Sequence, residues 1–121
     1  MYLIKKEFTV QAAHKLSLSY ESKCTNLHGH AWAFTVYMKS HDLNNDSMVA
    51  DFTHIKHAIQ DKLDHQYLND IFDFNTTSER IARWAFDNIN KLFGQEENHP
   101  ICYRVDVQEA EGSLATYTEE L

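Results

Sequence analysis

Hydrophobic and polar residues alternate near both ends of the chain, and helical spacing replaces this alternation in the middle. Residues 2–14 predict a strand, and the positions on its inward face are Phe8, Val10, Ala12 and His14. Residues 28–39 predict a second strand, whose alternate positions on one face are His28, His30, Trp32, Phe34, Val36 and Met38. The intervening residues 15–27 are rich in Ser and Asn and predict a loop.

Two amphipathic helices are predicted between residues 51 and 94. Asp51 is suited to cap the first helix, which continues to about Leu68 with an apolar face of Ile55, Ala58, Ile59 and Leu63. The run from Thr76 to Glu79 fits a capping box with Thr76 as the cap, and Gly94 marks the end of the second helix. The apolar face of this second helix is formed by Ile81, Ala85, Ile89 and Leu92.

Alternation returns in the last fifth of the chain. It predicts a third strand, whose inward positions are Ile101, Tyr103, Val105, Val107 and Glu109, and a fourth strand over residues 114–119. Cys102 is expected on the outward face, and no role is assigned to it. The order ββααββ predicts one α+β domain over residues 1–121, an antiparallel sheet with two helices on one face. Because such a four-stranded sheet has two open edges, we expect the chain to self-associate.

Charge and composition argue against two classes of partner, nucleic acids and membranes. The formal net charge of −7 argues against nucleic acid, whose binding depends largely on Lys and Arg. No apolar run approaches the roughly 20 residues that span a bilayer, so no membrane role is expected. Since the first residues do not resemble a secretory signal, we expect a cytoplasmic protein with Cys24 and Cys102 as free thiols.

Eight histidines are the compositional oddity, and three of them fall on predicted strand faces. His28 and His30 are two residues apart in a strand, so both imidazoles point to the same side. His14 closes the first strand on the corresponding face. Three imidazoles favour zinc over oxygen-seeking cations, and three protein ligands leave a fourth position open, as in catalytic zinc sites. The remaining histidines outside the helix end, which lie in polar surroundings, are expected to be solvated: His41, His54, His57 and His99.

Cys24 precedes His28 by four residues, in the loop that enters the second strand. Three interpretations stay open from the residues alone. Cys24 is a fourth zinc ligand that closes a structural site, a reactive thiol beside the metal, or an inert buried cysteine.

Two acidic positions also stand out. Asp64 and His65 end the first predicted helix and are either a polar helix terminus or an acid–base pair. Glu109 lies on an otherwise apolar face, where a carboxylate requires a partner such as an Arg or the guanidine-like edge of a ligand. If the strand has already ended there, Glu109 is solvated, and Glu111 is a rival for the same role.

These residues together resemble the 6-pyruvoyltetrahydropterin synthase / 6-carboxytetrahydropterin synthase family. The motifs that carry the resemblance are Phe8-x-x-x-Ala12-Ala13-His14, Cys24-x-x-x-His28-Gly29-His30, Met48-Val49-Ala50-Asp51-Phe52, Leu63-Asp64-His65-Gln66-Tyr67-Leu68-Asn69, Thr77-x-Glu79, Glu109 and Tyr117. They run in the family order across nearly the whole chain. Many relatives have Pro at the position of Thr76.

The resemblance implies a tunnelling fold, in which subunits join edge to edge into a barrel, usually a hexamer of two stacked trimers with active sites between subunits. It implies that His14, His28 and His30 bind zinc, that Cys24 abstracts a proton, and that Asp64 and His65 complete a triad with it. Substrate-binding residues carried over from the family are Glu109 at the pterin edge, Thr77 at the ring, and Ala50, Asp51 and Phe52 lining the pocket.

The short chain is similar to the bacterial branch, which converts 7,8-dihydroneopterin triphosphate to 6-carboxy-5,6,7,8-tetrahydropterin, acetaldehyde and triphosphate on the route to queuosine. The alternatives are a 6-pyruvoyltetrahydropterin synthase, which differs in product, and a non-catalytic zinc protein with a closed site. The residues that grip the triphosphate are not evident from the motifs, and Lys15, Lys23 and Arg80 are candidates.

Overall fold

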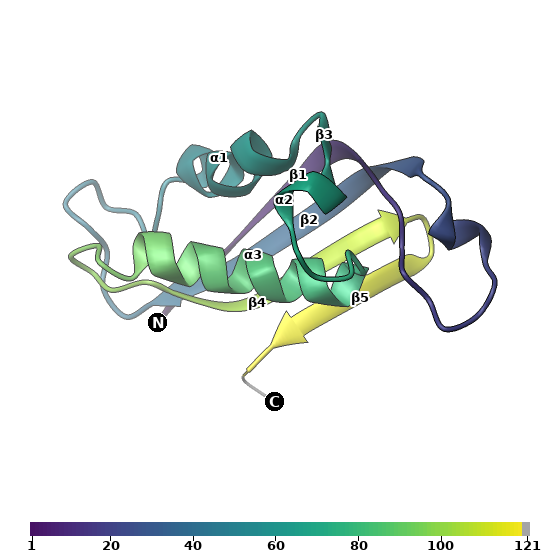
Figure 1. Ribbon diagram of the computed structural model, residues 1–121. Helices are drawn as coiled ribbons and strands as arrows, with labels where there is room; N and C mark the ends of the chain where they lie inside the picture. The colour runs from purple at the N-terminus through teal and green to yellow at the C-terminus, as the bar shows by residue number, and fades with distance from the viewer. Residues whose placement is uncertain (120–121) are drawn as a thin grey trace.

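The computed structural model describes residues 1–119, in which two long helices cover one face of a five-stranded sheet (Figure 1). The order of the strands across the sheet is β3-β1-β2-β4-β5. The strands are β1 (Tyr2–His14), β2 (His28–Ser40), β3 (Gln66–Tyr67), β4 (Ile101–Ala110) and β5 (Ser113–Thr118), and the helices are α1 (Phe52–Leu63), α2 (Leu68–Ile71) and α3 (Ser78–Phe93). The predicted α+β class is confirmed.

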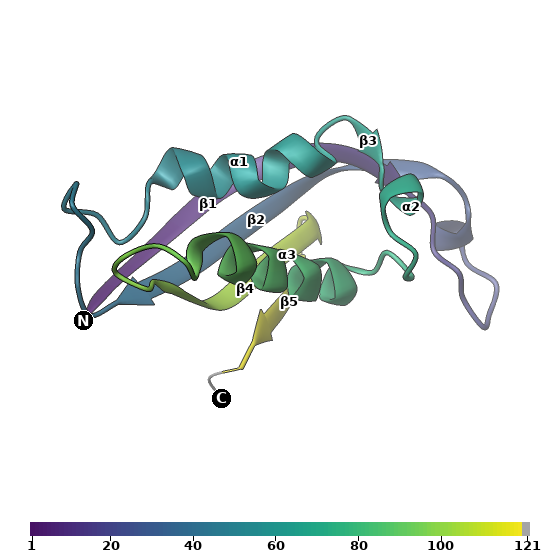
Figure 2. The same cartoon turned by 60° about the vertical axis from the view of Figure 1, so that its left-hand side comes forward.

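The turned view in Figure 2 shows α1 and α3 side by side above the same face of the sheet. The strands β1 and β2 form a long antiparallel pair, whose register runs from Tyr2 opposite Ser40 to His14 opposite His28. All pairings in the sheet are antiparallel except that of β3, which pairs in parallel with Ala12 and Ala13 of β1. No helix within residues 1–119 has the length and apolar character needed to cross a bilayer.

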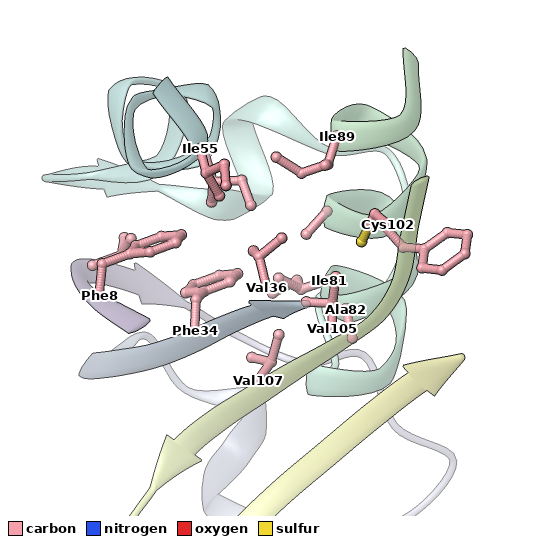
Figure 3. Packing of buried hydrophobic residues seen from close by; sticks show 14 of the residues in the cluster. Phe8, Phe34, Val36, Ile55, Ile81, Ala82, Ile89, Cys102, Val105 and Val107 are labelled. Atoms are coloured by element: carbon pink, nitrogen blue, oxygen red, sulfur yellow. The ribbon is translucent and has the colours of Figure 1, made fainter. Parts of the chain in front are cut away.

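The hydrophobic core lies between this sheet face and the two helices. Figure 3 shows Phe8, Phe34 and Val36 of the sheet beneath Ile55 and Ile89 of the helices. Phe8 and Phe34 stack with ring centroids 5.5 Å apart. The even-numbered positions of β1 from Phe8 onward and of β2 from Trp32 onward are buried, so the inward faces predicted for these two strands are confirmed.

The first helix is shorter than predicted. It ends at Leu63 instead of Leu68, because Asp64 is extended and His65 has a φ of 60°, which a continuing helix does not allow. The next residues form the two-residue strand β3 and the single turn of α2. Elements this short have no sequence periodicity, so the pattern could not predict them.

The face predicted for the third strand is wrong in its first half. The pairing of β4 with β2 shifts between Tyr37 opposite Arg104 and Met38 opposite Cys102, which leaves one extra residue in β4. Such a bulge reverses which side chains face the core. As a result Cys102 is fully buried, whereas Ile101, predicted inward, is exposed.

Two details of α3 also differ from the prediction. The cap is Thr77, whose side chain accepts a hydrogen bond from Arg80 N, so the capping position lies one residue later than Thr76. At the other end Phe93 is buried and Leu92 is exposed. Both lie within one turn of Ile89, at i+3 and i+4, and the sheet lies on the side of Phe93.

Candidate active site

The three predicted histidines converge at one end of the sheet, on its helix-covered face. His14 closes β1 directly opposite His28 of β2, and His30 lies opposite Ala12. The ring centroids are 4.5 Å apart for His14 and His28, 4.7 Å for His28 and His30, and 5.3 Å for His14 and His30. The shared face predicted from the period of two in both strands is therefore confirmed.

Glu109 of β4 completes this group. Its Oε1 atom lies 2.7 Å from His30 Nε2, 3.3 Å from His14 Nε2 and 3.8 Å from His28 Nε2. One ligand atom from each of the four residues lies within 4.8 Å of the others. Glu109 is thus directed inward, as predicted, but among residues 1–119 its partners are the three imidazoles and the Ser78 hydroxyl, and not an Arg. We call His14, His28, His30 and Glu109 the histidine cluster, and its donor atoms can hold a metal ion.

In His14 and His28, hydrogen bonds to the Nδ1 atom leave Nε2 free to bind such an ion. His14 Nδ1 lies 2.9 Å from the carbonyl oxygen of Thr76 and 3.1 Å from its hydroxyl, and His28 Nδ1 lies 2.7 Å from the carbonyl oxygen of Asn26. A carbonyl oxygen can only accept, so each Nδ1 donates and each Nε2 carries the lone pair. Within residues 1–119, His30 Nε2 is buried and, although Glu109 Oε1 lies 2.7 Å away, the angle does not allow a hydrogen bond between them. A ligand atom of a metal site would explain this unsatisfied nitrogen.

Burial holds the ring of His14 in the form that binds metals. The side chain is fully buried, and its ring packs edge-on against Trp32, with centroids 4.7 Å apart. Burial lowers the pKa of His14 below its ordinary value, and it outweighs the hydrogen bond with Thr76 and the attraction of Glu109, which act in the other direction. The neutral imidazole is the ligand form.

Cys24 lies on a short 3-10 turn, Lys23–Thr25, in the loop between β1 and β2. It is a free, half-buried thiol and is not part of the histidine cluster, and within residues 1–119 its sulfur has no hydrogen bond. Its backbone N–H donates to the Ser22 hydroxyl, and its carbonyl accepts from Leu16 N at 2.7 Å. Cys102 is also a free thiol, but burial in the core raises its pKa to about 12, so it stays protonated.

Asp64 and His65 form a separate group at the open edge of β1. The turn after α1 brings His65 Nε2 to 3.5 Å from Asp64 Oδ2, a contact that adjacent residues within a helix could not make. Asp64 Oδ1 accepts from Gln11 N at 2.8 Å, and His65 N donates to Gln11 O at 2.6 Å. The His65 ring is exposed and lines a pocket of about 510 Å³ together with Ala13 and Gly29, which occupy odd-numbered strand positions between the buried ones.

Asp64 and His65 bond to Gln11 within β1, whereas the Cys24 carbonyl bonds to Leu16, beyond the end of that strand. Within residues 1–119 no hydrogen bond or ion pair joins the three residues of the predicted triad. Which of them meet in an assembly depends on how copies associate.

The residues predicted to line the pterin pocket are also divided. Ala50, Asp51 and Phe52 lie at the start of α1, where Asp51 caps the helix as predicted by accepting from Thr53 N at 2.8 Å. Ala50 and Phe52 line a pocket with Tyr2 at the start of β1, and Asp51 lines a second pocket that shares Ala50. The histidine cluster is at the other end of this 13-residue strand, roughly 40 Å away at about 3.3 Å per residue.

Thr77, by contrast, starts α3 beside the histidine cluster. Its two neighbours, Thr76 and Ser78, make the contacts that sequence reasoning missed. Thr76 is fully buried against His14, and the Ser78 hydroxyl donates to Glu109 Oε2 at 3.2 Å. The sequence feature that could have revealed these contacts is the helix cap. A cap placed at Thr77 would have directed the side chains of Thr76 and Ser78 into the structure.

The exposure predicted for four other histidines is confirmed for His41, His54, His57 and His99.

The chain is similar to known proteins over nearly its whole length. The family model described as 6-pyruvoyl tetrahydropterin synthase matches residues 3–120. A 6-carboxy-5,6,7,8-tetrahydropterin synthase of Synechocystis sp. is 37% identical over 97% of this chain and 93% of its own length. One of Bacillus subtilis is 26% identical over 94% of this chain and 83% of its own.

Among solved structures, that of Caenorhabditis elegans 6-pyruvoyl tetrahydropterin synthase superimposes with a TM-score of 0.77. The alignment covers 98% of this chain and 96% of that one, at 23% sequence identity. At this identity the likeness shows the fold alone.

Proposed function

This chain belongs to the 6-pyruvoyl tetrahydropterin synthase family, and from that premise we propose that it is a 6-carboxytetrahydropterin synthase. The proposed reaction converts 7,8-dihydroneopterin triphosphate to 6-carboxy-5,6,7,8-tetrahydropterin, acetaldehyde and triphosphate, a step toward queuosine and other 7-deazaguanines. The convergence of three imidazole Nε2 atoms beside an inward carboxylate is the observation that carries the proposal. Relatives named for the carboxy product over nearly the whole chain support this branch.

We propose zinc as the metal. Its ligands would be His14, His28 and His30, since neutral imidazoles suit zinc and the Nδ1 partners of His14 and His28 leave Nε2 available. When bound there, zinc supplies Lewis-acid polarisation of the substrate's side-chain oxygens. Trp32 closes the base of the site, where its ring packs against those of His14 and His30.

Proton transfers fall to the thiol and the acid–base pair. Cys24 is the only thiol suited to this task among the described residues, since Cys102 is buried and protonated. The Cys24 thiolate takes a carbon-bound proton from the substrate side chain, and His65, oriented by Asp64, moves protons to and from the reacting oxygens.

Glu109 and the start of α3 would hold the pterin ring. The carboxylate accepts from the paired N–H groups at the ring's guanidine-like edge, and the Ser78 hydroxyl orients it through Oε2. Thr77 and its backbone neighbours at the same helix start would contact the ring.

We propose that the complete site forms between copies of the chain. Asp64 and His65 lie at the β1 edge of the sheet, and Ala50 to Phe52 lie at its far end from the histidine cluster. In the part of the chain that the structure describes, residues 2–11 of β1 have no strand on the β3 side, and β5 is the opposite edge strand. Edge-to-edge association can therefore bring the residues of one copy to the site of its neighbour. A hexamer of two stacked trimers around a barrel is the arrangement we expect.

Complementation between two inactive variants tests function and assembly together. Cys24→Ala and His65→Ala should each lose acetaldehyde release from 7,8-dihydroneopterin triphosphate. Oligomers that contain both variants should recover about one quarter of the sites, because each intact site then takes Cys24 and His65 from different copies. Mixed oligomers that stay inactive would show that the triad is not shared. Full activity of either variant alone would remove that residue from the reaction.

A further inference from the structure

Two asparagines hold the chain where it leaves β1, between the histidine cluster and Cys24. Asn69 Oδ1 accepts from Lys15 N at 3.0 Å, and Asn69 Nδ2 donates to Lys15 O at 3.0 Å. Asn75 makes the same two bonds with Ser17, at 3.0 Å and 2.8 Å. Each side-chain amide thus satisfies both backbone groups of one residue, as a neighbouring strand would.

This arrangement continues the sheet beyond the end of β3. The strand β3 pairs with Ala12 and Ala13, and Asn69 and Asn75 then take over at alternate residues on the same side of the chain. In an extended chain the intervening residue directs its N–H to the opposite side. That residue is Leu16, and its N–H donates to the Cys24 carbonyl at 2.7 Å.

A continuous set of hydrogen bonds therefore leads from the asparagines through residues 15–17 to the turn that carries Cys24. The same segment holds His14, because Thr76, next to Asn75, contacts His14 Nδ1. The Thr76 hydroxyl also lies 3.4 Å from Lys15 O and 3.5 Å from Asn69 Oδ1. A loop of this length would otherwise be free to move, and small displacements of reacting groups are costly to catalysis.

We propose that Asn69 and Asn75 are positioning residues that fix Cys24 relative to the histidine cluster. The inference rests on the proposed function, in which Cys24 is the reactive thiol. Neither asparagine touches the reacting atoms. Both act through the backbone of residues 15–17.

The chain contains a matched control. Asn90 clamps Cys102 in the same way, since its Oδ1 accepts from Cys102 N at 2.9 Å and its Nδ2 donates to Cys102 O at 3.1 Å. Like Asn69 and Asn75 it is half-buried. Replacing any of the three by Ala removes both hydrogen bonds to the backbone of one residue, and Asn69→Ala also removes the contact with the Thr76 hydroxyl. Only the Asn69 and Asn75 replacements affect the Cys24 segment.

The test compares Asn69→Ala and Asn75→Ala with Asn90→Ala in the full chain. The rate of Cys24 alkylation by iodoacetamide, followed by peptide mass, should rise about tenfold or more in the first two and stay unchanged in the third, because the freed loop opens more often. Their kcat should fall about 10–100-fold with KM within a few-fold. In Asn69→Ala and Asn75→Ala, which leave the contacts of Cys102 intact, alkylation of this buried core residue reports global unfolding in the same spectra.

The outcomes separate this inference from the proposed function. If both variants match Asn90→Ala in alkylation rate and kcat, the positioning role is wrong while the function stands. If the wild type does not turn over the substrate, the function fails, and the alkylation rates still decide whether the asparagines hold the thiol. If the Ala variants unfold enough for Cys102 to be alkylated, Asn75→Asp provides a milder form of the same test. Asp keeps the acceptor for Ser17 N and removes the donor to Ser17 O, so only one hydrogen bond is lost.

Discussion

Replacing Glu109 by Gln separates the two tasks that its position allows, binding the metal and binding the pterin. The carboxylate lies 2.7 Å from His30 Nε2 through Oε1 and accepts from the Ser78 hydroxyl through Oε2. Gln keeps the size of the side chain and removes its charge. In our account the carboxylate serves the pterin, and three imidazoles suffice for the metal.

The magnitude follows from the bonds that are lost. The guanidine-like edge of a pterin offers two N–H donors, and a carboxylate accepts from both. Gln presents only one acceptor and one donor. One charged hydrogen bond is therefore lost, and one N–H group of the pterin faces the N–H group of the amide. A hydrogen bond to a charged group contributes roughly 1.5–3 kcal/mol, and leaving a buried donor unpaired costs a similar amount. At the lower end of these ranges the two losses together are roughly 3 kcal/mol, which corresponds to at least about a 100-fold fall in kcat/KM.

The assay measures kcat/KM for 7,8-dihydroneopterin triphosphate at metal concentrations that fully load the variant, with the bound metal determined in the same samples. Glu111→Gln is the control, because it removes the same charge from an exposed residue two positions later. We expect Glu109→Gln to keep its defect at full metal occupancy and Glu111→Gln to behave as the wild type. Recovery of Glu109→Gln to wild-type activity on metal loading would show that Glu109 serves the metal alone and would refute the pterin role.

Two further predictions concern stability. Asp106→Asn should lower the free energy of unfolding by about 1–3 kcal/mol at neutral pH, because the Asp106 carboxylate accepts from Arg104 Nε at 2.8 Å and from Thr116 Oγ1 at 2.7 Å. Burial raises the pKa of Asp106, but the hydrogen bonds from Arg104, Thr116 and Tyr37 outweigh burial and hold this pKa below the ordinary 3.8. The difference between wild type and variant in the free energy of unfolding, measured with urea, should therefore shrink as the pH falls below 3.8. A difference that stays constant with pH would contradict this cause. Ile59→Ala should cost about 2–5 kcal/mol in the same assay, because Ile59 is fully buried between α1 and the sheet, and a loss below 1 kcal/mol would mean that the core there closes around the cavity.

The sequence predicted the site best where the chain is most regular. The period of two in β1 and β2 placed His14, His28 and His30 on one face, and the β1–β2 register then set them side by side. Long strands with alternating residues leave one register that buries all apolar positions, so this prediction had a strong physical basis.

The sequence was least informative where a single residue changes the geometry. One extra residue in β4 moved Cys102 from the predicted surface into the core, and nothing in the alternation marks where such a bulge occurs. The positive φ of His65 likewise ended α1 early and created the contact with Asp64, although the sequence there continues an acceptable helical pattern. The separation of Cys24 from Asp64 and His65 depends on tertiary contacts that no local pattern contains.

The central claim is tested most directly by the products of the zinc-loaded wild-type protein incubated with 7,8-dihydroneopterin triphosphate, identified by mass. Our account predicts acetaldehyde and 6-carboxy-5,6,7,8-tetrahydropterin in equal amounts, and no turnover after the metal is removed with a chelator. A pyruvoyl product would instead assign the chain to the other activity of its family. Unchanged substrate in the presence of bound zinc would contradict the enzymatic role altogether.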